Sequence, residues 1–125
     1  MPKKFMLPQE IELYYLIPSL RKQLAVALIN KGLKQKEVAR LLCITNAAIS
    51  QYLKGKRGKR FDAKVKSIAK EIEKSAEIIR KNKIKQKKQQ VAKELLRLVR
   101  IAKEKKINCE ICKTYNRINC KKKIC

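Results

Sequence analysis

The chain contains no histidine and few carboxylates, and both absences bear on catalysis. Its 125 residues include ten Asp and Glu, scattered along the sequence. General acid–base catalysis most often uses His, Asp or Glu. A nucleophilic Cys needs an activating partner, for which the sequence offers no candidate. No glycine-rich loop that could cradle a phosphate is present either. The sequence therefore predicts a protein that is not an enzyme.

Glycine and proline are also scarce, with three of each, so we expect few long structureless loops. No run approaches the roughly 18 apolar residues that a membrane helix needs. Behind Lys3 and Lys4, the apolar stretch is interrupted by Glu10 and Glu12, which argues against a signal peptide. The expected location is the cytoplasm. The length fits one domain, or one small domain with an appendage.

The charge balance is strongly one-sided, with 34 Lys and Arg and a formal net charge of +24. Such a surface repels its own copies and attracts polyanions. Lys enrichment is also typical of hyperthermophiles, and an A+T-rich genome would give the same bias. Neither explanation accounts for the shortage of acidic residues. We therefore expect a nucleic acid as the partner, with an anionic membrane surface as the rival interpretation.

Residues 35–53, QKEVARLLCITNAAISQYL, have the pattern of two short helices, 35–42 and 46–54, joined by a tight turn. Apolar side chains occur where the two helices would touch, at Val38, Leu42, Ile44, Ile49 and Leu53. Ala39 is small at the predicted crossing, which allows the backbones to approach closely. Thr45 stands at an N-cap position, where its hydroxyl can accept a hydrogen bond from a free backbone N–H.

The second predicted helix carries short polar or methyl-bearing side chains on one face, namely Asn46, Ala47, Ser50 and Gln51. A face of this kind suits the major groove of DNA. We predict base contacts from these four residues and a backbone contact from Thr45. The alternative interpretation is that this stretch is an ordinary two-helix hairpin, of the kind that any small helical protein can contain, with no role in DNA binding. The combined spacing of small, apolar and capping residues favours DNA binding.

This stretch resembles the helix-turn-helix of the Cro and phage-repressor type, and residues 7–58 resemble a family of small archaeal transcriptional regulators. The resemblance rests on Leu7-Pro8, Ile17-Pro18-Ser19-Leu20-Arg21, residues 35–53 and Lys54-Gly55-Lys56-Arg57-Gly58. Residues 47–58, AAISQYLKGKRG, are its most specific part. Cys43 departs from the motif, which usually has Gly at this turn position because Gly accepts a positive φ without steric cost. A Cys here implies a mildly strained turn or a shifted conformation, and we expect its side chain to pack in the turn.

The second predicted helix, 46–54, is the predicted recognition helix, which would enter the DNA groove. Basic residues are concentrated at its C-terminal end and in the segment that follows, at Lys54, Lys56, Arg57, Lys59 and Arg60. Gly55 and Gly58 allow this segment to bend along a phosphate backbone. Phosphate contacts set position and register, whereas base contacts select sequence. We therefore predict DNA-backbone contacts from these five basic residues. A second basic cluster comprises Lys81, Lys83, Lys85, Lys87 and Lys88. It could be a solvated linker or a second contact with DNA, and the sequence favours neither interpretation.

Further helices are expected on both sides of this unit. Residues 9–16 predict a short helix, and Pro18 suits the first turn of a second helix that ends near Gly32. After the basic segment, Asp62 is a candidate N-cap for a helix of about five turns. Its apolar stripe comprises Phe61, Val65, Ile68, Ile72, Ala76 and Ile79. A second stripe comprises Val91, Leu95, Leu98 and Ala102.

These two stripes could pack against the N-terminal helices or against the same stripes of a second copy. A palindromic operator is read by two recognition helices about 34 Å apart. We therefore expect a homodimer that is joined through residues 61–106.

The last seventeen residues, CEICKTYNRINCKKKIC, contain four cysteines: Cys109, Cys112, Cys120 and Cys125. Two thiolates three positions apart can grip one metal ion from a tight turn, and the later pair can complete a tetrahedron. Structural zinc is the first interpretation, and an iron–sulfur cluster is the alternative, since it also takes four Cys ligands. Reduced thiols or one disulfide, without a metal, is the third. Cys43 is not expected to be a ligand.

The expected fold is all-α, with a helix-turn-helix DNA-binding domain of the phage-repressor type, long C-terminal helices and a short Cys-rich tail. The expected segments are a DNA-binding domain at 1–60, a helical dimerisation and packing region at 61–106 and the tail at 107–125. We expect a transcriptional regulator that binds double-stranded DNA in a sequence-specific manner. The alternative is an RNA- or ribosome-associated basic protein with a zinc-binding tail, which leaves the helix-turn-helix spacing as coincidence.

Overall fold

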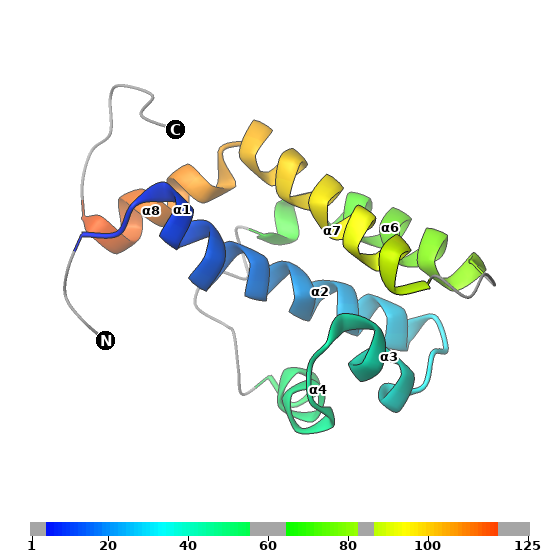
Figure 1. Ribbon diagram of the computed structural model, residues 1–125. Helices are drawn as coiled ribbons and strands as arrows, with labels where there is room; N and C mark the ends of the chain where they lie inside the picture. Colours follow the sequence, from blue (N-terminus) through cyan, green and yellow to red (C-terminus); the bar gives the residue numbers. More distant parts are fainter. Residues whose placement is uncertain (1–4, 56–64, 83–86, 118–125) are drawn as a thin grey trace.

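The computed structural model describes residues 5–55, 65–82 and 87–117. Regular structure in these ranges is helical, with no strand among them, which confirms the all-α prediction. The elements are α1 (Pro8–Ile11), η1 (Glu12–Leu16), α2 (Ile17–Asn30), α3 (Gln35–Leu42), α4 (Asn46–Leu53), η2 (Lys66–Ile68), α6 (Ala69–Lys81), α7 (Lys87–Glu104) and α8 (Ile107–Asn116). Figure 1 shows α2 in the middle, with α6 and α7 on one side and α4 on the other.

The first three elements run into one another as one helical path, so the expected break before Pro18 is absent. η1 is a π-helical turn, wider than an α-turn, and the residues that join it to α1 and α2 keep right-handed helical angles. The wider turn explains why the fully buried Ile11 and Leu16 face the core although they are five residues apart. It also lies where the ring of Pro18 would otherwise press on the carbonyl four residues before it.

The helix α2 ends as expected, because Gly32 adopts a φ of +100° just beyond its C-cap, Lys31. Lys31 then connects this end of α2 to α6, with its Nζ 3.1 Å from an Oε of Glu77 and 3.4 Å from an Oε of Glu73. The Glu77 carboxylate also pairs with Arg80 one turn later. These two cations, Arg80 first, lower the pKa of Glu77 from 4.5 to about 2.

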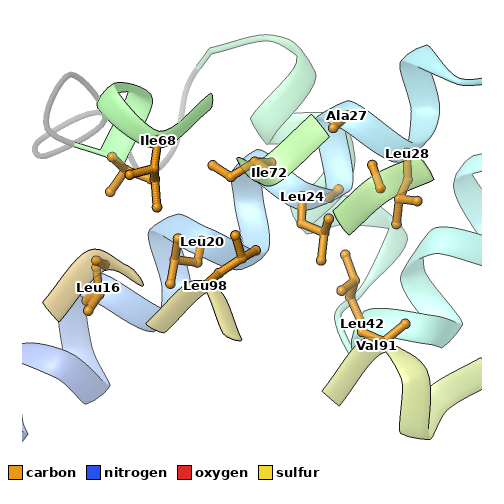
Figure 2. Close-up of a cluster of buried hydrophobic side chains, with 14 of the residues drawn as sticks. Leu16, Leu20, Leu24, Ala27, Leu28, Leu42, Ile68, Ile72, Val91 and Leu98 are labelled. Atoms are coloured by element: carbon orange, nitrogen blue, oxygen red, sulfur yellow. The ribbon is translucent and has the colours of Figure 1, made fainter. Parts of the chain in front are cut away.

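The hydrophobic core lies between α2 and the two helices α6 and α7 (Figure 2). On α2, Leu20, Leu24 and Leu28 are completely buried at a spacing of four residues. The apolar stripes predicted for the later helices belong to the same core cluster as these leucines. Their buried members are Val65, Ile68, Ile72, Ala76, Ile79, Val91, Leu98 and Ala102.

This packing identifies what covers the apolar stripes. They are buried against other helices of the same chain, which is one of the two arrangements expected for them. The homodimer through residues 61–106 stays a prediction. The boundary expected at residue 60 also stays a prediction, although α2 and α6, on either side of it, share one core. Residues 66–68 form a 3₁₀ turn before α6, and Phe61 and Asp62 lie outside the described residues.

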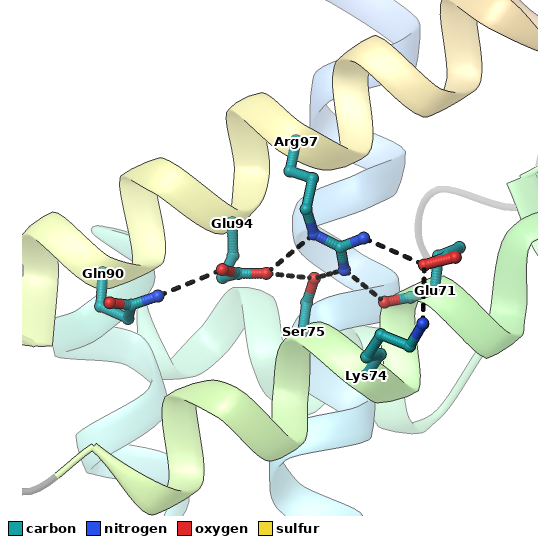
Figure 3. Close-up of polar contacts among 6 residues, drawn as sticks. All are labelled: Glu71, Lys74, Ser75, Gln90, Glu94 and Arg97. Atoms are coloured by element: carbon teal, nitrogen blue, oxygen red, sulfur yellow. Dashed lines mark hydrogen bonds and ion pairs between the residues drawn. The ribbon is translucent and has the colours of Figure 1, made fainter.

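A polar network joins α6 to α7 through Arg97 (Figure 3). The Arg97 guanidinium donates to an Oε of Glu71 at 3.0 Å, to the Glu71 carbonyl at 3.1 Å, to Ser75 Oγ at 2.7 Å and to an Oε of Glu94 at 3.1 Å. Ser75 also donates to Glu94 at 2.8 Å, and both side chains are buried. The Arg97 hydrogen bond lowers the pKa of Glu71. Every buried oxygen of this network thus has a donor within reach.

The helix α8 folds back onto the N-terminal segment, as the neighbouring positions of α1 and α8 show (Figure 1). The side-chain amide of Asn116 makes two hydrogen bonds with the backbone of Met6. The Met6 N–H donates to its Oδ1 at 2.9 Å, and its Nδ2 donates to the Met6 carbonyl at 3.0 Å. The C-x₂-C pair lies within this helix and not in the tight turn expected for it. Cys120 and Cys125 lie outside the described residues.

Candidate nucleic-acid interface

The helices α3 and α4 form the two arms of the predicted helix-turn-helix. Both begin where the sequence places them, and α4 ends one residue earlier than expected, with Lys54 as its C-cap. Val38 and Ile49 are completely buried between the arms and α2, and Ala39 is buried as the predicted crossing requires. These small and apolar contacts fix the angle at which α4 leaves the body of the protein.

The turn between the two helices is left-handed at Cys43, which adopts a φ of 55° and a ψ of 44°. The next amide, of Ile44, donates back to the Ala39 carbonyl at 3.0 Å and so closes the end of α3. Cys43 is exposed, so the expectation that its side chain packs in the turn is wrong. It occupies the conformation that Gly usually supplies, which confirms the predicted strain.

Thr45 is the N-cap of α4, as predicted. Its Oγ1 accepts a hydrogen bond of 3.0 Å from the Ala48 amide, and its backbone is extended. Removing such a cap usually costs about 1 kcal/mol. The cap fixes where α4 begins, and therefore which side chains occupy its first turns.

Those first turns point away from the core. Asn46, Ala47 and Gln51 are exposed, and Ser50 is partly buried. All four residues are neutral, and their side chains are short or of medium length, so a nucleobase edge could approach this face closely. Contact with bases remains a prediction for each of them. The structure does leave three of the four side chains accessible on one short helix.

Gln35, the first residue of α3, belongs to this surface although the sequence analysis missed it. Its Nε2 donates to Ser50 Oγ at 2.8 Å and to the Asn46 carbonyl at 3.1 Å. A single side chain of α3 thus connects two of the predicted base-contact positions. Its place at the start of the first arm marks where α3 begins, but no signal in the sequence marks its contacts with α4.

The apolar stripe of α4 is shorter than predicted. Leu53 is 46% exposed, so its assignment to the core is wrong, and Ile44 is only partly buried. Leu53 is the last residue of α4. Leu41 of α3 is buried, although it does not belong to the predicted stripe.

Lys54 is the described member of the predicted phosphate-contact group, and its side chain is exposed. Gly55 follows with a φ of +69°, so the chain bends directly after α4 as predicted. Lys56, Arg57, Lys59 and Arg60 lie outside the described residues. In the second basic cluster, the side chains of Lys81 and Lys88 are exposed, whereas Lys83 and Lys85 lie outside those residues.

Residues 24–63 match a family model described as Helix-turn-helix. The match includes all of α3 and α4 together with the second half of α2, and it supports a DNA-binding transcriptional regulator of this class in general. The archaeal origin, the dimer and the individual base contacts stay predictions. No curated protein and no solved structure shows significant similarity to the chain.

Among the described residues, no helix is both long and apolar enough to span a bilayer. Nothing in the comparisons supports the RNA- or ribosome-associated alternative. For the metal, residues 5–55, 65–82 and 87–117 bring together no group of three Cys, Asp or Glu side chains that could bind one.

Proposed function

We propose that this protein is a sequence-specific transcriptional regulator that reads the major groove of double-stranded DNA with α4. One observation carries the proposal. A helix that starts at a capped Thr45 presents Asn46, Ala47 and Gln51 to the outside, while its other face is fixed by the buried Ile49. A recognition helix contacts base edges with its N-terminal residues, and these are the residues that α4 exposes.

The proposed contacts follow from the chemistry of the side chains. Asn46 and Gln51 can each make a bidentate contact to adenine, and the Ala47 methyl can meet a thymine methyl. Ser50 contacts a base or a phosphate, and Thr45 a phosphate. Lys54 and the basic residues that follow it neutralise phosphates along the groove. This division predicts a preference for A·T pairs at some positions of each half-site.

A binding-site selection from random duplexes tests the proposal. The wild-type chain should enrich one sequence, and Gln51→Ala should relax the preference at one base pair, since a bidentate contact discriminates by about 1–3 kcal/mol. Competition between the selected duplex and a structured RNA of equal length provides the second readout. Failure to enrich any sequence, or stronger binding to the RNA, would refute the proposal.

We also propose that the Cys-rich C-terminus binds a metal ion, with zinc as the first candidate and an iron–sulfur cluster as the alternative. The helix α8 places Cys109 and Cys112 one turn apart, and Asn116 Nδ2 lies 3.3 Å from Cys112 Sγ as a donor. An amide N–H directed at sulfur is the kind of outer contact that orients a thiolate ligand. Cys120 and Cys125 would complete the set of four ligands, and the bound metal would fasten the tail.

Metal analysis and an absorbance spectrum of protein purified without oxygen test this second proposal. Stoichiometric zinc supports the first candidate, and iron with visible absorbance supports the second. Protein that holds neither metal, even after anaerobic reconstitution, refutes both.

A further inference from the structure

The N-terminal end of the protein is the longest part of the chain without positive charge. Residues 5–20 contain no Lys or Arg and two Glu, in a chain whose net charge is +24. Two copies of such a cationic protein repel each other over most of their surfaces. Any face on which they approach closely should therefore be one to which the chain contributes little positive charge.

The same run carries four large apolar side chains that are exposed to solvent, and we call this set the end surface. It consists of Phe5, Leu7, Leu13 and Tyr14, which are 55%, 57%, 57% and 58% exposed. Ile11 and Leu16 point inward from the same helical path and are completely buried. Because the inner side of α1 and η1 is used by the core, the outer side leaves its large apolar side chains in water.

The end surface is held in place by polar contacts. Phe5 and Leu7 flank Met6, whose backbone is fixed from both sides by Asn116. The Leu7 amide donates to an Oε of Glu10 at 3.0 Å, and Glu12 pairs with Lys103 of α7 at 3.3 Å. Terminal segments usually fray unless they are tied down. Here the ties keep the apolar side chains on the outside, which lowers the entropic cost of binding a partner.

Other exposed apolar residues do not form a comparable surface. Leu53, Ile78 and Leu96 lie on α4, α6 and α7, and each is the only exposed large apolar side chain among the described residues of its helix. The stripes of α6 and α7 are already covered by α2.

We propose that the end surface binds the same surface of a second copy of this chain and forms a two-fold symmetric dimer. A two-fold interface brings one patch against itself, which suits an apolar surface whose own segment, residues 5–14, contributes no Lys or Arg. This inference rests on the proposed function in one respect, because a dimer is the arrangement that reads a palindromic operator. The proposed interface consists of residues 5–14 and not of the apolar stripes of α6 and α7.

Sedimentation velocity without DNA, over a range of protein concentrations, tests the interface with a matched pair of variants. Leu13→Lys adds a charge to the end surface, and Leu96→Lys adds the same charge to an exposed leucine of α7 that is 66% exposed. The wild type should be a dimer. Leu13→Lys should raise the dimer dissociation constant at least about tenfold, which corresponds to 1.4 kcal/mol. Leu96→Lys should change it by less than about twofold.

Tyr14→Lys provides a second variant of the end surface, and thermal melting checks that all three variants fold. A monomeric wild type overturns the inference. An equal effect of Leu13→Lys and Leu96→Lys also overturns it, because a general charge effect would then explain the result.

DNA binding separates this inference from the proposed function. In one outcome the wild type is a dimer, Leu13→Lys weakens that dimer, and no specific DNA sequence is bound. This outcome supports the proposed interface and refutes the proposed function as a regulator. A monomeric wild type that still selects one half-site sustains the regulator and refutes the interface.

Discussion

Gln35 Nε2 lies 2.8 Å from Ser50 Oγ, across the gap between the two arms of the helix-turn-helix. The contact joins the first turn of α3 to the face of α4 that we assign to the bases. The helix that positions α4 is therefore hydrogen-bonded directly to the face of α4 that is proposed to contact DNA.

Gln35→Ala should weaken binding to the selected duplex by about fivefold or more, because two hydrogen bonds of roughly 0.5–1.5 kcal/mol each position α4. Gln89→Ala, which truncates an exposed glutamine of α7, is the control and should have little effect. Fluorescence anisotropy with labelled duplex gives the affinities. If Gln35 acts through Ser50, the double variant Gln35→Ala, Ser50→Ala should bind the duplex with the same affinity as whichever single variant has the lower affinity.

Lys54→Ala should weaken binding to specific and random duplexes by the same factor, because a phosphate contact carries no sequence information. The slope of log K against log salt should fall in magnitude by about 0.9 for one lost contact. Lys70→Ala removes the same charge from an exposed position on α6 and should leave the slope unchanged. A change of base preference in Lys54→Ala would contradict the assignment.

Cys43→Gly should stabilise the protein by about 1 kcal/mol, since a side chain in the left-handed region costs roughly 1–2 kcal/mol and Gly removes that cost. The exposed thiol contributes little packing to offset the gain. Urea unfolding gives the free energy. Cys43→Ser keeps the strained backbone and serves as the control, so equal stabilities of the Gly and Ser variants would count against the explanation.

The features of the site that are local in sequence could be predicted. The N-cap at Thr45, the buried Val38 and Ile49 and the left-handed residue before α4 each follow from neighbours within a few positions. The contact of Gln35 could not, because its partners lie 11 and 15 residues away and meet it only once the crossing of α3 and α4 is fixed.

The same distinction applies to the fold. The apolar spacing identifies which side of α6 and α7 is buried, but it does not say what covers that side. A stripe on a helix is satisfied equally by α2 of the same chain or by a second copy. The π-helical turn is equally hidden, because residues 9–16 look in the sequence like one ordinary short helix, and the five-residue step from Ile11 to Leu16 carries no local mark of a wider turn.

Arg97→Met should destabilise the protein by about 2–3 kcal/mol, since it leaves the buried Glu94 carboxylate without its cation, and breaking a buried pair is costly. Arg100→Met removes an exposed arginine from the same helix and should cost much less. The comparison is made by urea unfolding. Adding Glu94→Gln to Arg97→Met should recover part of the lost stability, and a double variant less stable than Arg97→Met alone would contradict the role of the buried charge.

The stability of the protein should fall as the pH decreases from about 5 towards 2, in part because of Glu77. Arg80 and Lys31 lower its pKa from 4.5 to about 2 in the folded state. Between these values the unfolded chain binds a proton that the folded chain does not, so acid favours unfolding. Glu77→Gln should flatten this part of the profile, measured by urea unfolding at several pH values. Glu73→Gln removes a more exposed carboxylate, 3.4 Å from Lys31, and should leave most of the slope intact. If the two variants flatten the profile equally, the pH dependence reflects overall charge and not the contacts of Glu77 with Arg80 and Lys31.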